Sequence, residues 1–198
     1  MGFRPYESVG TVCTGFARPG TKNLLTAAND LWDYSMSFGI YNCRLSTAGS
    51  QLSMHAEGRA ADIGFPVIAG EPHPTAYDLF GVLRTNAWEL GIQYIIFDRR
   101  SYSKAYPWGK PYLGPNPHID HLHVEQTREA AGSLSLDAAY FLLGDDMLTA
   151  EQETALNELV AVRKQVIEAG SSLSLLIPTL KLIKLMRNVD NLFDSEEF

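Results

Sequence analysis

The sequence has little cysteine, no concentrated positive charge and no long apolar run. Among its 198 residues, 16 are lysine or arginine and 23 are aspartate or glutamate, which gives a formal net charge of -7 at pH 7. No basic run is longer than the pair Arg99 and Arg100. Because nucleic-acid-binding surfaces depend on clustered positive charge, we expect no nucleic acid among the partners of this chain.

Features of secretion signals and membrane spans are also lacking. The N-terminal stretch MGFRPYESVG has no basic segment followed by an apolar one, so it does not resemble a secretory signal. The apolar run LSLLIPTL is too short to cross a bilayer and is followed by Lys181 and Lys184. We therefore expect synthesis in the cytoplasm and no membrane contact. Attachment of these lysines and Arg187 to an anionic membrane surface is the alternative.

Only two cysteines occur, Cys13 and Cys43. Neither belongs to a CxxC pair or lies beside a histidine cluster. We predict two isolated buried thiols, and a single disulfide between them is the alternative. The hydrophobic fraction of 45% and the charged fraction of 20% indicate one globular domain with an appendage.

Apolar spacing and turn residues predict a domain of mixed helices and strands that ends near residue 144. The expected helices cover residues 23–38 and 75–90, and the expected strands cover residues 40–45, 60–66, 93–98 and 121–126. Residues 99–117 are expected to form a long functional loop. Its Tyr106, Trp108 and Tyr112 either wall a binding cleft or cover an exposed sheet edge.

Residues 145–198 have a different character. Thr149 and Gln152 form a capping box, and apolar residues at helical spacing follow it. This pattern predicts a helical hairpin whose apolar faces are buried against another copy of the chain or against a target surface. We favour self-association, which would make the protein a homo-oligomer.

The segment SMHAEGRAAD places charged and polar side chains directly before an apolar run, AADIGF. These side chains are His55, Glu57, Arg59 and Asp62. Because burial of an unpaired carboxylate costs free energy, Asp62 needs a compensating cation. Glu57 and Arg59 are expected to be solvated.

A second histidine cluster occurs in PHIDHLHVE. On a regular strand, His121, His123 and Glu125 share one face. An HxH pattern alone is equally compatible with a solvated surface. His118 lies further from this pattern and is not expected to bind a metal, and His73, between two prolines, is an expected loop residue.

The two clusters together supply the ligands of a metal site. His55, Asp62 and His123 offer two imidazoles and one carboxylate, which is a ligand set of catalytic zinc sites. Asp120 remains as a spare carboxylate, and a divalent cation would neutralise Asp62. Since strict alternation would place Asp120 and His123 on opposite faces, we predict that regular strand pairing begins only after Asp120.

These motifs resemble those of the zinc-dependent M15 peptidases of bacterial cell walls. SMHAEGRAAD fits the pattern S-x-H-x-x-G-x-A-x-D, and DHLH fits a later D/E-x-x-H element. The resemblance covers about residues 20–130. It implies that His55, Asp62 and His123 bind Zn²⁺ and that Asp120 is the catalytic base.

The resemblance also implies substrate-binding residues. Arg44 resembles an arginine that faces substrate carboxylates, with a surface ion pair as the alternative. Ser53 resembles the signature serine, which tightens the turn or contacts substrate. His121 would contact the substrate or the oxyanion, and a merely solvated imidazole is the alternative.

The expected fold is α+β, with a small, mainly antiparallel sheet flanked by helices, a zinc cleft and a C-terminal helical tail. The resemblance implies hydrolysis of an amide bond in peptidoglycan stem peptides, as in bacteriophage endolysins that cut between L-Ala and D-Glu. Such an enzyme is made in the cytoplasm of the bacterial host and acts at the cell wall. Alternatives are a D-Ala-D-Ala carboxypeptidase, a cytoplasmic dipeptidase and a non-catalytic zinc-stabilised wall-binding module.

Overall fold

The computed structural model describes residues 2–46, 49 and 51–144. The predicted domain boundary and the predicted helical hairpin of residues 145–198 lie at or outside the end of the described residues. The described part is an α+β domain with a mainly antiparallel sheet, which confirms the predicted fold class. None of its helices is both long enough and apolar enough to cross a membrane.

Six strands form one sheet in the order β1-β2-β8-β5-β6-β7, and every neighbouring pair is antiparallel. The strands are β1 (Met36–Gly39), β2 (Ala60–Gly64), β5 (Ile92–Phe97), β6 (Arg100–Ser103), β7 (Tyr106–Pro111) and β8 (His121–Gln126). A separate small hairpin consists of β3 (Val67–Ile68) and β4 (Glu71–Pro72). The central strands β2 and β8 therefore bring two distant sequence segments side by side.

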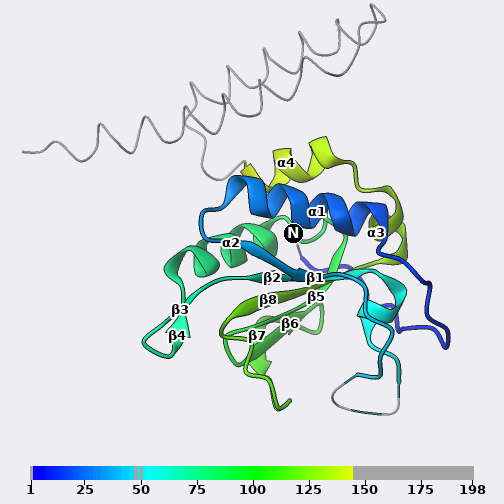
Figure 1. The fold of residues 1–198 in the computed structure, drawn as a ribbon, viewed down its shortest axis with the longest axis horizontal. Helices are drawn as coiled ribbons and strands as arrows, with labels where there is room; N and C mark the ends of the chain where they lie inside the picture. Colours follow the sequence, from blue (N-terminus) through cyan, green and yellow to red (C-terminus); the bar gives the residue numbers. More distant parts are fainter. Residues whose placement is uncertain (1, 47–48, 50, 145–198) are drawn as a thin grey trace, which may run out of the picture. The chain divides into compact units, whose positions relative to one another are not determined.

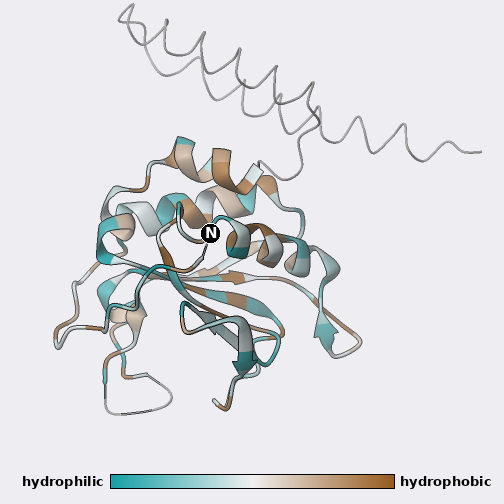
Figure 2. Cartoon of the chain, turned by 180° about the vertical axis from the view of Figure 1, so that it is seen from behind, coloured by the Kyte–Doolittle hydropathy of each residue, from teal (hydrophilic) through white to brown (hydrophobic). Residues whose placement is uncertain are grey.

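The helices gather on one side of this sheet (Figure 1). They are α1 (Pro19–Leu31), α2 (Pro74–Thr85), α3 (Arg128–Ser133) and α4 (Leu136–Gly144), and a 3-10 turn, η1 (Met54–Glu57), precedes β2. Figure 2 shows apolar positions on the central strands and on the helices that cover them. The domain thus has two layers, and the apolar core lies between them.

Strand β8 divides its side chains between the two faces of the sheet. Leu122 and Val124 are fully buried in the core cluster. Because successive side chains of a strand point to opposite faces, His121, His123 and Glu125 lie on the face away from the core. The predicted strand at residues 121–126 is confirmed, and pairing in β8 begins at His121, as predicted.

The first predicted helix was placed too far along the chain. Helix α1 begins at Pro19, a residue that suits the first helical position, and it ends at Leu31. Trp32 already has an extended backbone and is buried in the core. Residues 36–39 form strand β1, whereas the predicted strand at residues 40–45 is a loop with one isolated bridge at Leu45.

The predicted loop of residues 99–117 is mostly a strand hairpin, β6 and β7. Its proline and glycine content concealed this, but Tyr102 is buried and its ring lies 4.6 Å from that of Phe80. Gly109 has a φ of 80°, and a side chain there would meet the Tyr102 ring. The predicted helix of residues 75–90 is also shorter, since α2 ends at Thr85.

Candidate metal centre

The 3-10 turn η1 presents His55. Ser53 precedes the turn, and its hydroxyl accepts a hydrogen bond from the backbone N–H of His55 at 3.4 Å. Gly58 closes the turn with a left-handed backbone, φ 66° and ψ 23°. A Cβ at Gly58 would lie 2.2 Å from the carbonyl oxygen of Phe16, so only glycine fits this crossing of two backbones. The turn thus delivers His55 beside the start of β2.

Strand pairing places the other two predicted ligands opposite each other. Asp62 on β2 and His123 on β8 are direct partners in the antiparallel register. Directly opposed residues project their side chains to the same face with Cβ atoms about 4.5 to 5.5 Å apart. Both side chains therefore lie on the face of the sheet away from the core.

The structure brings His55, Asp62 and His123 into one group. Nδ1 of His123 lies 2.8 Å from Oδ1 of Asp62, and Nε2 of His55 lies 3.2 Å from Oδ2 of the same carboxylate. The two imidazole nitrogens are 3.2 Å apart. One potential ligand atom from each residue lies within 4.8 Å of the others, and no fourth His, Cys, Asp or Glu of the described residues joins this group.

The second nitrogen of each imidazole has a partner outside the group. Nδ1 of His55 lies 2.7 Å from the carbonyl oxygen of Ile40, which can only accept, so this nitrogen carries the proton. Nε2 of His123 lies 3.2 Å from Oε1 of Glu125. The inward-facing atoms are therefore Nε2 of His55 and Nδ1 of His123.

The electrostatics of the group favour an ionised Asp62 beside a positively charged His123. Burial alone would raise the pKa of Asp62, but hydrogen bonds and positive charge from His123 and His55 lower it well below its ordinary value. Burial alone would lower the pKa of His123, but its hydrogen bonds to Asp62 and Glu125 raise it to about 10. Asp62 is thus held ionised, and positive charge is favoured beside it.

Asp120 and His121 form a pair next to this group. Asp120 immediately precedes β8, and its backbone carbonyl accepts a hydrogen bond from Phe65 at 2.8 Å. Its half-exposed carboxylate lies 2.7 Å from Nδ1 of His121. Nε2 of His121 lies 3.9 Å from Oδ1 of Asp62. His121 therefore lies between the spare carboxylate and the group of three.

The matched family places the chain among known sequences. A family model described as the VldE C-terminal domain matches residues 15–118, more than half of the chain. The chain belongs to this family. No curated protein and no solved structure gave a match. The matched part of this VldE-type domain includes His55 and Asp62 and ends before Asp120 and His123.

The structure does not bring Arg44 into contact with the group of three. Arg44 is exposed, and its guanidinium donates to the carbonyl oxygen of Leu45 at 3.2 Å. Its backbone carbonyl accepts a hydrogen bond from Ser53, so this loop leads directly into the turn that carries His55. Ser53 itself is buried and acts on that turn through its hydroxyl.

The prediction that Glu57 and Arg59 are solvated is wrong. Both are buried, at 7% and 1% exposure, and Nε of Arg59 donates to Oε2 of Glu57. Oε1 of Glu57 accepts from the backbone of Gly10 at 2.6 Å and from Arg128 at 3.0 Å. Hydrogen bonds to Gly10, Arg59 and Arg128 outweigh burial and lower the pKa of Glu57. The charges of Glu57 and Arg59 are therefore compensated by protein groups and not by solvent.

Two histidines without an expected role have structural contacts. The ring of His73 accepts a hydrogen bond from Thr75 at 3.2 Å and so caps helix α2. His118 is buried with its ring centroid 4.6 Å from that of His121. Burial, with His121 and His123 nearby, lowers the pKa of His118 to about 4, so it is neutral at pH 7.

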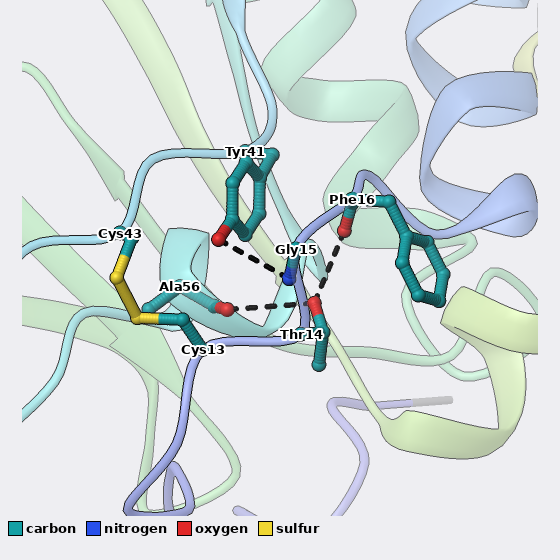
Figure 3. Close-up of a disulfide and its surroundings, with 7 residues drawn as sticks. All are labelled: Cys13, Thr14, Gly15, Phe16, Tyr41, Cys43 and Ala56. Carbon is teal, nitrogen blue, oxygen red and sulfur yellow. Dashed lines mark hydrogen bonds between the residues drawn. A yellow bond between two sulfur atoms is a disulfide. The ribbon is translucent and has the colours of Figure 1, made fainter.

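Cys13 and Cys43 form a disulfide (Figure 3), and the prediction of two isolated thiols is wrong. Their Cα atoms are 5.6 Å apart although 30 positions separate them in sequence. Next to the bridge, the backbone N–H of Thr14 donates to the carbonyl oxygen of Ala56 at 2.9 Å. The bridge therefore joins the N-terminal segment to the loop before His55.

The three aromatic residues of the predicted loop are not one cluster. Trp108 and Tyr106 on β7 are exposed, at 77% and 48%, and Arg84 lies over the Trp108 ring at 4.9 Å. Tyr112 lies after β7, and its ring meets His118 edge-on at 5.0 Å. Of the three, only Tyr112 contacts a residue beside the candidate centre.

Proposed function

We propose that this VldE-type domain is a zinc-dependent peptidase that hydrolyses an amide bond in peptidoglycan stem peptides, as in endolysins that cut between L-Ala and D-Glu. The observation that carries the proposal is the convergence of His55, Asp62 and His123 within 4.8 Å on the face of the sheet away from the core. The resemblance of the SMHAEGRAAD and DHLH motifs to M15 peptidases supports it.

The donor set fits zinc. Two imidazoles and one carboxylate are the kind of ligands found in catalytic zinc sites, whereas a structural site needs four protein ligands. Among the described residues only three ligands converge, which favours a catalytic centre over a zinc-stabilised binding module. Zinc in such a site supplies a Lewis acid that lowers the pKa of water to about 7 and polarises a carbonyl.

The residues around the group suit proton transfer. Asp120 would accept the proton of the attacking water on its carboxylate and pass it to the leaving amine. The hydrogen bond between Nδ1 of His121 and Asp120 would orient this carboxylate, and the His121 ring would contact the substrate beside the group of three. The exposed guanidinium of Arg44 would bind a carboxylate of the stem peptide in a bidentate manner.

The disulfide supports action outside the cytoplasm. Disulfides form and persist in oxidising surroundings and are rare where glutathione keeps thiols reduced. Cys13 and Cys43 would therefore be bridged at the cell wall rather than at the place of synthesis. This favours a wall enzyme over a cytoplasmic dipeptidase.

Digestion of purified sacculi tests the proposal. The released muropeptides are analysed by mass spectrometry with and without a chelator, and with zinc added back. New amino termini at D-Glu, lost with chelator and restored by zinc, are expected. Release of D-Ala alone would assign the carboxypeptidase activity instead, and an unchanged wall would reject peptidase action.

A further inference from the structure

We propose that Glu125 is a positioning residue that fixes the tautomer and orientation of His123, so that His123 binds the metal through Nδ1. This inference rests on the proposed zinc site but concerns a residue outside the three ligands. It assigns a task to a buried acid that the ligand set and the proton-transfer pair leave unused.

Each ring nitrogen of His123 has a different carboxylate partner. The two nitrogens point in opposite directions, and Nδ1 lies 2.8 Å from Asp62 whereas Nε2 lies 3.2 Å from Glu125. A metal ligand must offer a lone pair, so Nδ1 has to be unprotonated and Nε2 has to carry the proton. A carboxylate can only accept a hydrogen bond, and Glu125 therefore stabilises the tautomer that zinc requires.

Glu125 is itself held in place. It is 7% exposed on the central strand β8, and its Oε2 accepts a hydrogen bond from Nε2 of Gln93 at 3.3 Å. Gln93 is fully buried and pairs with both backbone groups of Glu7, accepting at 3.0 Å and donating at 3.2 Å. The carboxylate is thus fixed by a side chain that is anchored to the N-terminal segment.

Glu125 does not serve as a fourth ligand. It lies at the outward nitrogen of His123, and it is not part of the group whose ligand atoms lie within 4.8 Å of one another. Glu125 therefore adds no fourth protein ligand to His55, Asp62 and His123. Loss of a partner behind a ligand histidine costs about 10- to 100-fold in metal affinity.

The two ligand histidines differ in tautomer. Nδ1 of His55 donates to the carbonyl oxygen of Ile40, which leaves Nε2 for the metal. His123 has the opposite arrangement because of Glu125. Zinc-loaded protein with ¹⁵N-labelled histidine should therefore show one ligand ring protonated at Nδ1 and the other at Nε2.

The test compares zinc affinity of the full chain, measured by competition with a chromophoric chelator, for wild type, Glu125→Ala and Glu125→Gln. We expect Glu125→Ala to weaken zinc binding about 10- to 100-fold. Glu125→Gln retains an acceptor oxygen and should fall between Glu125→Ala and wild type. Glu57→Ala is the matched control, because Glu57 is an equally buried acid whose carboxylate pairs with Gly10, Arg59 and Arg128 rather than with a ligand histidine. This control should retain wild-type affinity while losing thermal stability.

Absorption spectra of the Co²⁺-loaded proteins give a second readout. Glu125→Ala should shift the d–d bands because the His123 ring is no longer held, whereas Glu57→Ala should leave them unchanged. Wild-type affinity and an unchanged spectrum in Glu125→Ala would overturn the inference. If Glu125→Ala does not fold, the ¹⁵N spectrum of zinc-loaded wild type decides, and binding of the metal through Nε2 of His123 would overturn the inference. Wild-type protein that binds no metal would reject the zinc site and this inference together, whereas zinc binding without peptidase activity would reject only the proposed function.

Discussion

One ten-residue motif, SMHAEGRAAD, contributes residues to two clusters of charged and titratable side chains that differ in kind. Glu57 and Arg59 enter a network in which each charge meets an opposite charge or a backbone group. His55 and Asp62 enter a group in which two imidazole nitrogens and a carboxylate face one another within 4.8 Å. Neighbouring residues of one short segment thus belong to two different arrangements, a completed network and a candidate cation site.

In the completed network, protein groups alone stabilise the buried charges. The Arg59 guanidinium donates to Glu57, to the carbonyl oxygen of Gln126 at 2.9 Å and to those of Glu7 and Ser8 at 2.8 and 3.0 Å. Arg128 adds a second cation to Glu57. Buried ion pairs are tolerated when further hydrogen bonds satisfy the remaining donors and acceptors. Among the described residues, no side chain of this network belongs to a group that could hold a metal ion.

The group of three differs because its potential ligand atoms all lie close to one another. Nε2 of His55 and Nδ1 of His123 are 3.2 Å apart and both face Asp62. A single proton can join only two of these atoms in a hydrogen bond, whereas one divalent cation can accept a lone pair from all three residues. This difference between the clusters is the argument for a metal. Variants that change one cluster and leave the other intact test the argument.

The largest effect is expected from Asp62→Asn. This change keeps the shape of the side chain but removes its charge, and zinc affinity should fall by more than about 100-fold, beyond the loss for an outer partner. Peptidase activity should fall to background. Titration calorimetry with Zn²⁺ measures the affinity, and Glu57→Gln, which alters the other cluster, should bind zinc as wild type does. Equal zinc affinity in Asp62→Asn and wild type would remove the distinction between the clusters.

Asp120→Ala should separate metal binding from catalysis. General acid–base groups contribute about 10²- to 10⁴-fold to rate, so kcat on a stem peptide should fall by that factor while bound zinc stays constant. Metal content by mass spectrometry and initial rates measure the two quantities. Asp33→Ala, a change of an exposed aspartate, is the control and should leave both unchanged. Full lysis by zinc-loaded Asp120→Ala would reject Asp120 as the base.

The disulfide links the surroundings of the two clusters. Cys13 lies in the N-terminal segment, and Cys43 follows Ile40, whose carbonyl oxygen accepts a hydrogen bond from His55. For a bridge that closes a loop of 30 positions, the Cys13→Ser/Cys43→Ser variant should lose about 3 to 4 kcal/mol of unfolding free energy. Urea unfolding under oxidising conditions measures the loss. Wild type in reductant should match the variant, and a difference from oxidised wild type below about 1 kcal/mol would contradict the chain-entropy account.

The sequence predicted the group of three because its residue types form a zinc ligand set and its two motifs resemble those of M15 peptidases, although Asp62 and His123 lie 61 positions apart. The spacing from His55 to Asp62 spans one glycine turn, and the alternation of β8 places His123 on the face away from the core. It did not predict the Glu57 network, because its second cation, Arg128, lies 71 residues away in sequence and no motif links it to Glu57. The disulfide was missed for a similar reason, since pairing of two cysteines depends on tertiary path. Hairpin β6–β7 was missed because proline and glycine usually indicate loops.

The smallest effect concerns pH and the completed network. The pKa of Glu57 is lowered in the folded protein, since hydrogen bonds from Gly10, Arg59 and Arg128 outweigh burial. A carboxyl whose pKa is lower in the folded than in the unfolded state contributes stability that is fully present above the unfolded value and is lost as pH falls through the folded value. Metal-free wild type should therefore lose unfolding free energy as pH falls below about 4.5, the ordinary pKa of glutamate. Glu57→Gln should be less stable at pH 7 and should show a shallower loss in acid, because it has no carboxylate to protonate. Denaturant titrations from pH 7 to pH 3 compare the two slopes, and equal slopes would mean that Glu57 is not held ionised by this network.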